Sequence, residues 1–326
     1  MNKTLSLRFR KWAGPLRENE RSFFTKLFEI ASGCNIEIVD SLAGLVDVEI
    51  ESVYGERMIP SKSSRLYRFV HSYLPSGIRF DSGKHTPNQQ PSGTGRVKIF
   101  FTGENERPPE GRWDAYLTFD QHSYGGRNAY LPLWWLTSSD LVVPQVSPYL
   151  GRAITLEQML SPRQANLTGR DKFCVAFIGK AYPFRMHALT ALSKIGKVDV
   201  FGGVARNTIM TKADSKFEIS QKYKFIFCHE NDLFPGYVTE KAPEAWATGA
   251  VPLYWGSDPA GYLNEKALIN LASFPTLEDY IDYIKLVNND DNLWRTYAES
   301  PLLLKKPNID QVVQVLKQAL KPLGLD

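Results

Sequence analysis

Cysteine is scarce in this sequence, with three residues at Cys34, Cys174 and Cys228. Their odd number and wide spacing exclude a framework of disulfides, and they do not form the CxxC pairs typical of zinc sites. We therefore expect all three to be small, buried, apolar residues.

Long apolar runs are also missing, since no stretch approaches the roughly 20 apolar residues that a membrane-spanning helix requires. The opening residues, MNKTLSLRFRKWAG, lack the apolar core of a secretory signal. The sequence therefore predicts synthesis and residence in the cytoplasm.

Neither sign of charge dominates the chain. It has 39 Lys and Arg residues against 35 Asp and Glu residues, a net charge of +4, and the two kinds are interleaved. Nucleic-acid-binding proteins usually cluster their basic residues on one face, so this pattern argues against a nucleic-acid partner. A small positive excess is compatible with an anionic small ligand, such as a nucleotide, or with loose attachment to anionic lipid.

Patterns typical of metal sites are absent as well. The chain contains no D-x-D motif, and the nearest match is Asp47-Val48-Glu49. His122, His187 and His229 have no partner at ligand spacing, which favours a packing or hydrogen-bonding role for each. We therefore expect no bound divalent metal.

Aromatic residues, by contrast, are plentiful: 7 Trp, 15 Tyr and 18 Phe. Core packing accounts for many of them, but Trp and Tyr rings also stack on the apolar faces of sugars. Trp134 and Trp135 lie in the continuous apolar run LPLWWL, so the sequence favours the core for this pair. Composition leaves the role of the other rings open.

Helix-like and strand-like patterns alternate in the first part of the chain. Helical spacing covers Asn19 to Ser32, and a surface loop rich in Gly, Pro and Ser covers Asp81 to Gly95. Strand-like runs cover Ile36 to Val39, Val46 to Ile50 and Val97 to Phe101. The last run is nearly continuous in apolar residues, as buried parallel strands usually are.

The same alternation begins again near Lys172. The predicted elements are strands at Phe173 to Gly179, Val198 to Phe201, Tyr223 to Cys228 and Val251 to Trp255, with helices at Met186 to Ile195 and Glu240 to Thr248. Such alternation is typical of βαβ units in parallel sheets. Because the series occurs twice, we expect an α/β protein of two doubly wound, Rossmann-like domains facing a cleft.

The predicted domains cover residues 1–150 and 160–305. In the remaining segment, 306–326, apolar residues from Asn308 to Leu320 share one broad helical face, and Pro322 lies just past its end. We expect this helix to dock back on the N-terminal domain rather than to enter a membrane.

The densest group of polar residues lies between Tyr223 and Gly256, in YKFIFCHENDLFPGYVTEKAPEAWATGAVPLYWG. A buried strand would deliver His229 to Asn231 to the carboxyl end of its sheet, where open α/β folds bind ligands. The segment Thr239 to Lys241 would then lead into a helix, and Pro243 could itself be the first helical residue.

Two interpretations of Thr239 to Lys241 are open. A helix N-terminus suits a phosphate group, Lys241 would add a full positive charge there, and Glu240 could accept hydrogen bonds from ribose hydroxyls. Alternatively, Thr239 caps the helix, Glu240 is a first-turn acid favoured by the dipole, and Lys241 is a solvated charge. Spacing alone does not decide between them.

The stretch from Tyr223 to Gly256 resembles the signature of the α-1,3/4-fucosyltransferases. Other segments are similar to that family in the same order: VKIFFTGEN (Val97 to Asn105), WDAYLTFD through Arg127 to LPLWW (Trp113 to Trp135), FCVAFIG followed by Arg185, and VDVFGG followed by Arg206-Asn207. Together they cover residues 97–300, about two thirds of the chain, whereas the first 80 or so residues carry no recognised motif.

The resemblance implies a GT-B fold, with an acceptor-binding N-terminal domain and a GDP-sugar-binding C-terminal domain. It implies inverting transfer of L-fucose from GDP-β-L-fucose to a glycan hydroxyl, which we expect to be O3 of GlcNAc. We expect that no cofactor is required and, from the missing D-x-D motif, that no divalent metal is essential. With no signal or anchor, we expect a bacterial-type cytoplasmic α-1,3-fucosyltransferase, peripheral to the inner membrane, that acts on a glycan such as an O-antigen lipopolysaccharide chain.

The resemblance also implies a role for particular residues. Glu104 would be the general base, Arg185 and Lys241 would neutralise the diphosphate, and Glu240 would hold the ribose. Asn231 and Tyr237 would line the nucleotide site. Without the family, the residues alone favour a turn carboxylate for Glu104, and Arg185 could be a surface charge.

On the acceptor side, the resemblance places Arg127 in the N-terminal part of the site, and we expect Trp113 and Tyr124 to contact the acceptor. The chain departs from the family at Gly179-Lys180, where the family has Ser-Asn, and Lys180 could supply a further cation near the phosphates. It also departs in the loop Asp232 to Pro235. These departures leave open a relative that uses another GDP-sugar. A separate alternative is a catalytically silent module that binds a glycan or a nucleotide.

Overall fold

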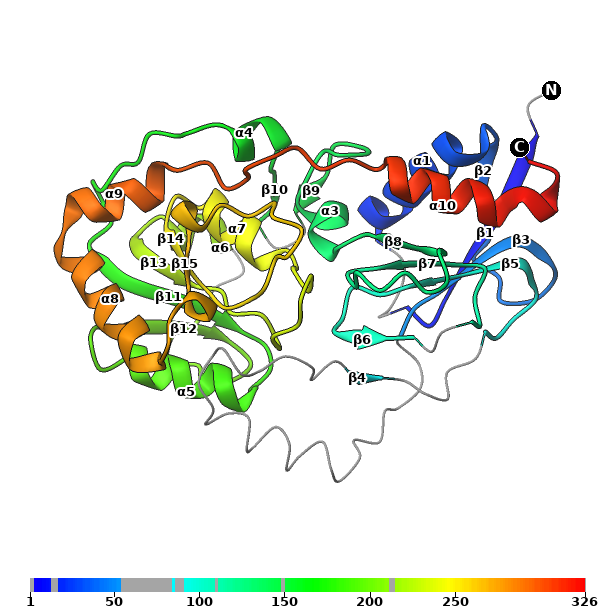
Figure 1. The fold of residues 1–326 in the computed structure, drawn as a ribbon. Coiled ribbons are helices and arrows are strands. Elements are labelled where there is room, and N and C mark those ends of the chain that lie inside the picture. Colours follow the sequence, from blue (N-terminus) through cyan, green and yellow to red (C-terminus); the bar gives the residue numbers. More distant parts are fainter. Residues whose placement is uncertain are drawn as a thin grey trace. The chain divides into compact units, whose positions relative to one another are not determined.

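The computed structural model describes residues 3–12, 17–53, 84–85, 91–108, 111–147, 150–210 and 215–325. These residues form two compact units (Figure 1). Unit 1 takes in the described residues up to 53, those from 84 to 145, and 307–325, and unit 2 takes in those from 146 to 306. Within the described ranges, no helix is both long and apolar enough to span a bilayer.

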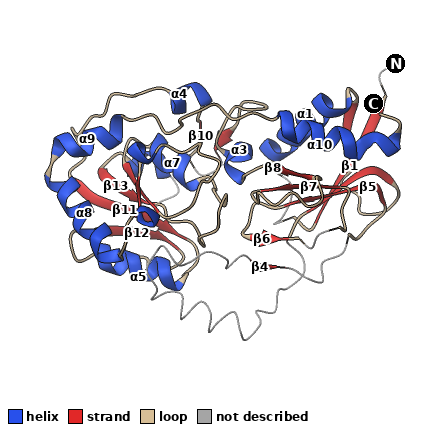
Figure 2. Cartoon of the chain, viewed as in Figure 1, coloured by secondary structure: helices blue, strands red, loops and turns tan. Residues whose placement is uncertain are grey.

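Unit 1 is built on a sheet of six parallel strands in the order β2-β1-β3-β5-β7-β8. Figure 2 draws the strands in red. The strands are β1 (Thr4–Arg10), β2 (Asn35–Ile38), β3 (Val46–Glu51), β5 (Gly95–Phe101), β7 (Ala115–Thr118) and β8 (Asn128–Tyr130). Short strands β4 (Lys84–His85) and β6 (Glu106–Arg107) pair separately. Lys84 and His85 thus form a strand inside the predicted loop Asp81–Gly95, and residues 81–83 and 86–90 of that loop lie outside the described ranges.

Helix α1 (Glu18–Ser32) and helix α10 (Asp310–Leu320) pack against each other in unit 1, and α10 also contacts β7 and β8. Helix α1 buries the apolar face that its spacing predicted and ends at Gly33, whose φ of 67° suits glycine at a helix C-terminus. Helix α10 buries Val312, Val315 and Leu316. A short helix, α3 (Leu133–Thr137), carries Trp134 and Trp135, which are buried as predicted.

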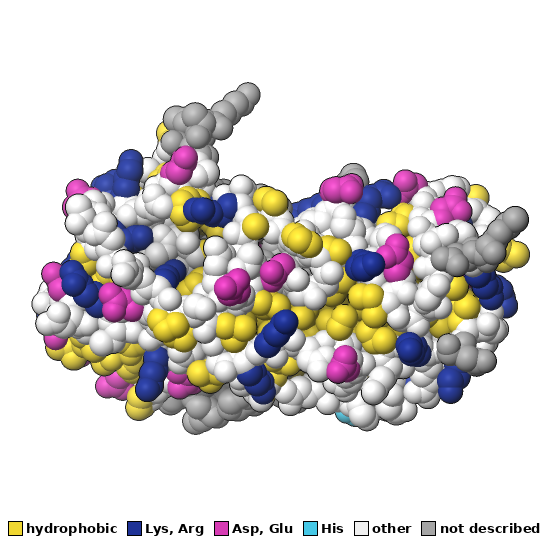
Figure 3. Space-filling view, turned by 90° about the horizontal axis from the view of Figure 1, so that it is seen from above, with side chains coloured by type: hydrophobic (Ala, Val, Ile, Leu, Met, Phe, Trp, Pro, Cys, Tyr) yellow, Lys and Arg dark blue, Asp and Glu magenta, His cyan; other side chains and the backbone are white. Residues whose placement is uncertain are grey.

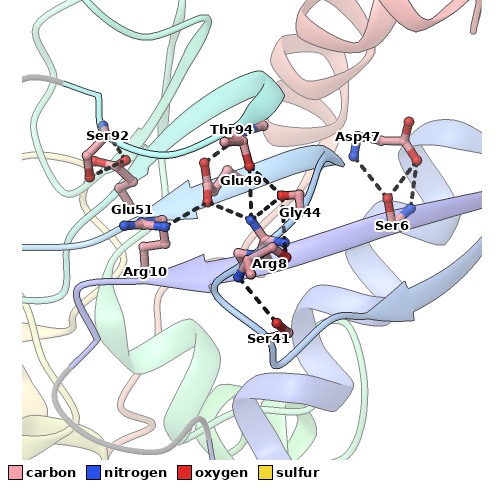
Figure 4. Close-up of polar contacts among 12 residues, drawn as sticks. Ser6, Arg8, Arg10, Ser41, Gly44, Asp47, Glu49, Glu51, Ser92 and Thr94 are labelled. Carbon is pink, nitrogen blue, oxygen red and sulfur yellow. Dashed lines mark hydrogen bonds and ion pairs between the residues drawn. The ribbon is translucent and has the colours of Figure 1, made fainter.

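Strand β1 contains a buried charged side chain, Arg8, whose charge is compensated by an ion pair and hydrogen bonds (Figure 4). Arg8 is 1% exposed and donates to the carbonyls of Ala43, at 2.8 Å, and Gly44, at 3.1 Å. It lies 3.5 Å from Oε1 of Glu49 on the neighbouring strand β3, and Oε2 of Glu49 accepts the Gly95 N–H at 3.0 Å. Buried charges are tolerated when they are paired in this way.

Unit 2 has a five-stranded parallel sheet in the order β12-β11-β13-β14-β15. The strands are β11 (Lys172–Ile178), β12 (Val198–Gly202), β13 (Tyr223–Phe227), β14 (Val251–Tyr254) and β15 (Ile269–Asn270). The helices are α4 (Leu156–Leu160), α5 (Pro183–Leu192), α6 (Lys216–Ser220), α7 (Lys241–Ala247), α8 (Leu277–Asn289) and α9 (Asp291–Glu299), and strands β9 (Val146–Ser147) and β10 (Arg152–Ala153) form an antiparallel pair.

Each helix and strand that the sequence predicted is present. The largest shift concerns the helix predicted at Met186–Ile195, which runs from Pro183 to Leu192 because proline is well suited to a first helical position. All three cysteines are buried and free, as predicted. On the face drawn in Figure 3, Lys and Arg side chains lie among Asp and Glu side chains rather than in one basic patch.

Candidate functional site

The strand order of unit 2 creates a switch point between β11 and β13. The chain leaves β11 toward β12 on one side, whereas β13 lies on the other side, and ligands of open α/β sheets bind at the carboxyl ends of such strands. A pocket of about 100 Å³ lies there. Its charged lining residues are Arg185, Lys216, Glu240, Lys241 and Glu244, and its apolar lining includes Leu150, Phe177, Ile178 and Phe227.

Glu230 organises the entry into helix α7. It lies three residues beyond the end of β13, is fully buried, and accepts the Thr239 N–H at 2.8 Å and the Thr239 hydroxyl at 2.8 Å. It also accepts from Nζ of Lys241 at 3.0 Å and from the Tyr254 hydroxyl at 3.3 Å. One carboxylate therefore holds both the backbone and the cation at the start of the helix.

The ion pair explains why Lys241 keeps its charge in the pocket. Burial alone would lower the pKa of the Lys241 ammonium, but Glu230 and Glu240 outweigh burial and raise this pKa above its ordinary value. The Lys241 side chain is 23% exposed and also lies 3.8 Å from Glu240. The interpretation of Lys241 as a freely solvated charge is therefore wrong.

Two further details of this helix start differ from the alternatives considered for the sequence. Thr239 does not cap helix α7, because its hydroxyl contacts Glu230 and the N-cap residue is Glu240. Pro243 is the third residue of the helix rather than the first. It is tolerated there because the first N–H groups of a helix have no partner within the helix.

Arg185 is held on helix α5 and is 6% exposed, so it is not a surface charge. Its guanidinium donates to the His229 carbonyl at 2.8 Å and to Oδ1 of Asn231 at 2.6 Å. Burial lowers its pKa, and Glu230 partly offsets that effect. The segment that follows β13 thereby positions a second cation in the pocket that contains Lys241.

Lys216 and Glu244 line the same pocket and were missed in the sequence. Glu244 lies on helix α7, is 7% exposed, and accepts a hydrogen bond from the hydroxyl of Ser147. Burial and the nearby Glu240 raise its pKa to about 8. Burial lowers the pKa of Lys216, whose ammonium lies 5.3 Å from the centre of the Phe177 ring. A signal for Glu244 existed in its four-residue spacing from Glu240, since such residues share a helix face.

The other residues predicted to bind the nucleotide, Asn231, Tyr237 and Lys180, do not line the pocket. Asn231 contacts Arg185 and so holds a residue that lines the pocket. Tyr237 is buried, and its N–H donates to the Phe234 carbonyl at 3.0 Å. Lys180 follows β11 and is exposed. In the loop Asp232 to Pro235, Leu233 and Phe234 are buried, so the altered loop packs into unit 2.

Glu104 lies in unit 1, three residues beyond β5, in the turn Gly103-Glu104-Asn105. Its N–H donates to Oγ1 of Thr102 at 3.1 Å, and its carbonyl accepts from the Glu106 N–H at 2.7 Å. The backbone of the turn is thus fixed at the carboxyl end of a central strand, with the Glu104 side chain half-buried.

Trp113 and Tyr124 belong to a small aromatic cluster of unit 1. Trp113 is 1% exposed and Tyr124 is 3% exposed, and both pack with Phe100 and Tyr116. Arg127 donates to the Trp113 carbonyl at 3.0 Å. Contact between either ring and an acceptor would require this cluster to open, because neither ring presents an exposed face.

Within the described ranges, no group of three or more His, Cys, Asp or Glu residues is placed to hold a metal ion. His229 is buried and its Nε2 lies 3.3 Å from the Tyr280 hydroxyl, which agrees with the packing role predicted for it. The cations of the pocket are Arg185, Lys216 and Lys241.

Known proteins share the sequence of this region. Residues 168–300 match the family model of the glycosyltransferase family 10 (fucosyltransferase) C-terminal region. The chain is 29% identical over 226 residues to the α-(1,3)-fucosyltransferase FucT of Helicobacter pylori, which covers 63% of this chain and 47% of that protein. It is 31% identical over 114 residues to human GDP-fucose protein O-fucosyltransferase 3, covering 32% of this chain and 24% of that protein. The chain thus spans less than half the length of these relatives.

Solved structures share the fold over almost the whole chain. A crystal structure of an α1,3-fucosyltransferase matches with a TM-score of 0.67 and 20% identity, covering 98% of this chain and 91% of that one. A crystal structure of an α1,3-fucosyltransferase with GDP-fucose matches with a TM-score of 0.65 and 21% identity. The predicted resemblance to the fucosyltransferases and the predicted α/β, GT-B fold class are both confirmed.

Proposed function

We propose that this chain is an inverting fucosyltransferase that transfers L-fucose from GDP-β-L-fucose to a glycan hydroxyl, with O3 of GlcNAc as the expected acceptor atom. The observation that carries the proposal is the pocket in unit 2, where Arg185, Glu240 and Lys241 meet at the carboxyl ends of β11 and β13. The matched region, residues 168–300, contains all three.

The pocket suits the donor nucleotide. Arg185 and Lys241 are cations held by neighbouring groups rather than by solvent, so they need little rearrangement when a diphosphate binds. Negative charge grows on the diphosphate as it leaves, and prepositioned cations stabilise that charge more in the transition state than in the ground state. Glu240 would accept hydrogen bonds from the ribose hydroxyls. Asn231 would act by positioning Arg185.

The reaction itself is one in-line displacement. Glu104 would take the proton of the acceptor hydroxyl while its oxygen forms a bond to the anomeric carbon of fucose, and the bond from that carbon to the phosphate oxygen breaks. The products are the inverted fucoside, GDP and a protonated Glu104. The fixed turn after β5 supports this role, because a general base must be held in place relative to the acceptor.

We further propose that no divalent metal is required, because the cations of the pocket can balance the diphosphate charge. Turnover measured after treatment with EDTA should equal that of untreated enzyme. A loss of turnover that Mg²⁺ or Mn²⁺ restores would contradict this part of the proposal. A cytoplasmic location, peripheral to the inner membrane, stays a prediction.

The deciding experiment is a turnover assay with GDP-fucose, GDP-mannose and oligosaccharide acceptors that end in N-acetyllactosamine. The proposal predicts transfer from GDP-fucose alone and an α-1,3-linked product, identified by NMR of the purified glycan. Transfer from GDP-mannose instead would favour a relative with another donor. Binding of GDP without any transfer would favour a silent nucleotide-binding module.

A further inference from the structure

The pocket extends beyond the residues that suit a diphosphate and a ribose. Glu240 and Glu244 are four residues apart at the start of helix α7, so they share one face and are separated by about 6 Å along the axis. Lys216, on helix α6, lines the same pocket as Glu244. A nucleoside that placed its ribose at Glu240 would therefore bring its base toward Glu244 and Lys216.

Glu244 still has acceptor capacity. One carboxyl oxygen, Oε1, accepts from the Ser147 hydroxyl. Among the described residues, no hydrogen bond reaches the other oxygen, Oε2, although the residue lines the pocket. Apolar side chains, among them Leu150, Phe177 and Ile178, line the rest of the cavity and suit the flat faces of a base.

We propose that Glu244 and Lys216 together bind the polar edge of the donor's guanine and thereby select guanine nucleotides. This inference rests on the proposed function, which supplies a GDP-linked donor. Guanine presents two adjacent donors, N1–H and the N2 amino group, beside one acceptor, O6. A carboxylate accepts from both donors, and an ammonium donates to O6.

Other bases do not match this pair. Adenine presents an acceptor at N1, which a carboxylate would repel, and uracil flanks its single N–H with two carbonyl oxygens. Hypoxanthine lacks the N2 amino group, and xanthine replaces it with an oxygen. Specificity would thus arise from both attraction to guanine and repulsion of the alternatives.

The charges around Glu244 agree with a site that binds two hydrogen-bond donors. Glu240, Lys216 and Lys241 are the charged groups that act on Glu244, and burial together with Glu240 raises the pKa of Glu244 to about 8. Hydrogen bonds from guanine would favour the carboxylate form. Binding of GDP would then release a proton from Glu244 at neutral pH.

The test compares the binding of GDP, IDP and XDP to the full chain by isothermal titration calorimetry near pH 8. We expect the wild type to bind GDP about 10- to 100-fold more tightly than IDP, because one hydrogen bond to a charged group is lost with IDP. Glu244→Gln should bring the GDP and IDP affinities to within about threefold and should improve XDP relative to GDP, because the amide can donate to the xanthine oxygen.

Two matched variants separate recognition of the base from a general loss of folding or of nucleotide binding. Ser147→Ala removes the partner of Glu244 but keeps the carboxylate, so the preference for GDP over IDP should remain. Lys216→Met should weaken GDP and IDP alike, because both carry O6. Thermal unfolding of each variant reports whether it is folded.

The inference is overturned if wild type and Glu244→Gln show the same ratio of GDP to IDP affinity, or if Glu244→Gln weakens all three nucleotides equally. If the wild type binds GDP and transfers fucose, but Glu244→Gln has the same ratio of GDP to IDP affinity as the wild type, then guanine selection by Glu244 is wrong and the proposed function stands. If the wild type binds none of the three nucleotides, the proposed function fails and this inference fails with it.

Discussion

Lys241 illustrates how a single charge is prepared for a ligand. Its ammonium is already paired with Glu230, at 3.0 Å, and is close to Glu240, so its charge persists despite burial. A cation that is fixed before the substrate binds stabilises a leaving diphosphate without reorganisation during the reaction. The acidic neighbours are therefore part of the proposed catalytic arrangement rather than competitors for it.

We predict that Lys241→Met lowers kcat for fucose transfer by about 100- to 1,000-fold, because it removes one fixed donor to the departing phosphate. The measurement is a steady-state assay with saturating GDP-fucose. Lys222→Met, which changes an exposed lysine of the same unit, is the matched control and should retain wild-type turnover. A kcat within tenfold of wild type for Lys241→Met would contradict the assigned role.

Glu104→Gln separates the two roles considered for this residue. If Glu104 is the general base, kcat falls by about 100- to 10,000-fold while the Kd for GDP is unchanged, because the nucleotide pocket lies in unit 2. If it is only a turn carboxylate, turnover survives and the melting temperature falls. Glu37→Gln, at an exposed position of the same unit, controls for loss of one carboxylate.

The raised pKa of Glu244 predicts how the free energy of unfolding depends on pH. Its pKa is about 8 in the folded protein and lies near 4.5 when it is solvated, so the native state binds the additional proton between these values. The free energy of unfolding therefore falls as the pH rises from about 4.5 to 8, on the order of a few kcal/mol in total.

Urea unfolding of the wild type and of Glu244→Gln, at about pH 5.5 and pH 8.5, measures this contribution. The Gln variant should lose less stability between the two pH values, because it carries no proton to release. Equal losses in the two proteins would contradict the raised pKa.

At the scale of elements, the strands and helices with regularly spaced apolar residues were predictable from the sequence. The sequences of strands β5, β11 and β13 are nearly continuous in apolar residues, because side chains on both faces of these strands are buried. Strand β1 was missed, because TLSLRFR carries two arginines and no local rule indicates that Arg8 is neutralised by Glu49, 41 positions away. Only the folded sheet brings β1 and β3 together.

Helix α10 gives the prediction for this scale. Leu316 is fully buried on the face of α10 that packs in unit 1, so Leu316→Ala should lower the free energy of unfolding by about 2–5 kcal/mol. The measurement is equilibrium denaturation of the full chain. Gln318→Ala, at an exposed position of the same helix, should stay within about 0.5 kcal/mol of wild type. Similar effects of the two substitutions would contradict the packing of α10.

At the scale of the whole molecule, the candidate site was only partly predictable. The resemblance named Arg185, Glu240 and Lys241, which the structure brings to one pocket. It did not name Glu244 or Lys216, because their neighbourhood depends on α6, α7 and the segment at Ser147 meeting in space. The burial of Trp113 and Tyr124 could likewise not be predicted from the sequence, because an aromatic residue in a loop can either pack in a core or stack on a sugar.

The division into two units predicts where GDP stabilises the chain. All of the residues assigned to the nucleotide lie in unit 2, whereas the proposed base, Glu104, lies in unit 1. A ligand that binds only the folded state stabilises it by RT ln(1 + [L]/Kd), which is about 2.7 kcal/mol at 100 times the Kd. Without an acceptor, that stabilisation should be confined to unit 2.

Hydrogen exchange followed peptide by peptide, with and without GDP, tests this expectation. Peptides from residues 216–254 should exchange more slowly with GDP, since they contain α6, β13, α7 and β14, whereas peptides from 95–108 should be unchanged. Lys241→Met should reduce the protection of the first set at a fixed GDP concentration, because the variant binds the diphosphate less tightly. Equal protection of both sets would show that GDP stabilises unit 1 as well, and the nucleotide site would then have to include residues beyond the pocket of unit 2.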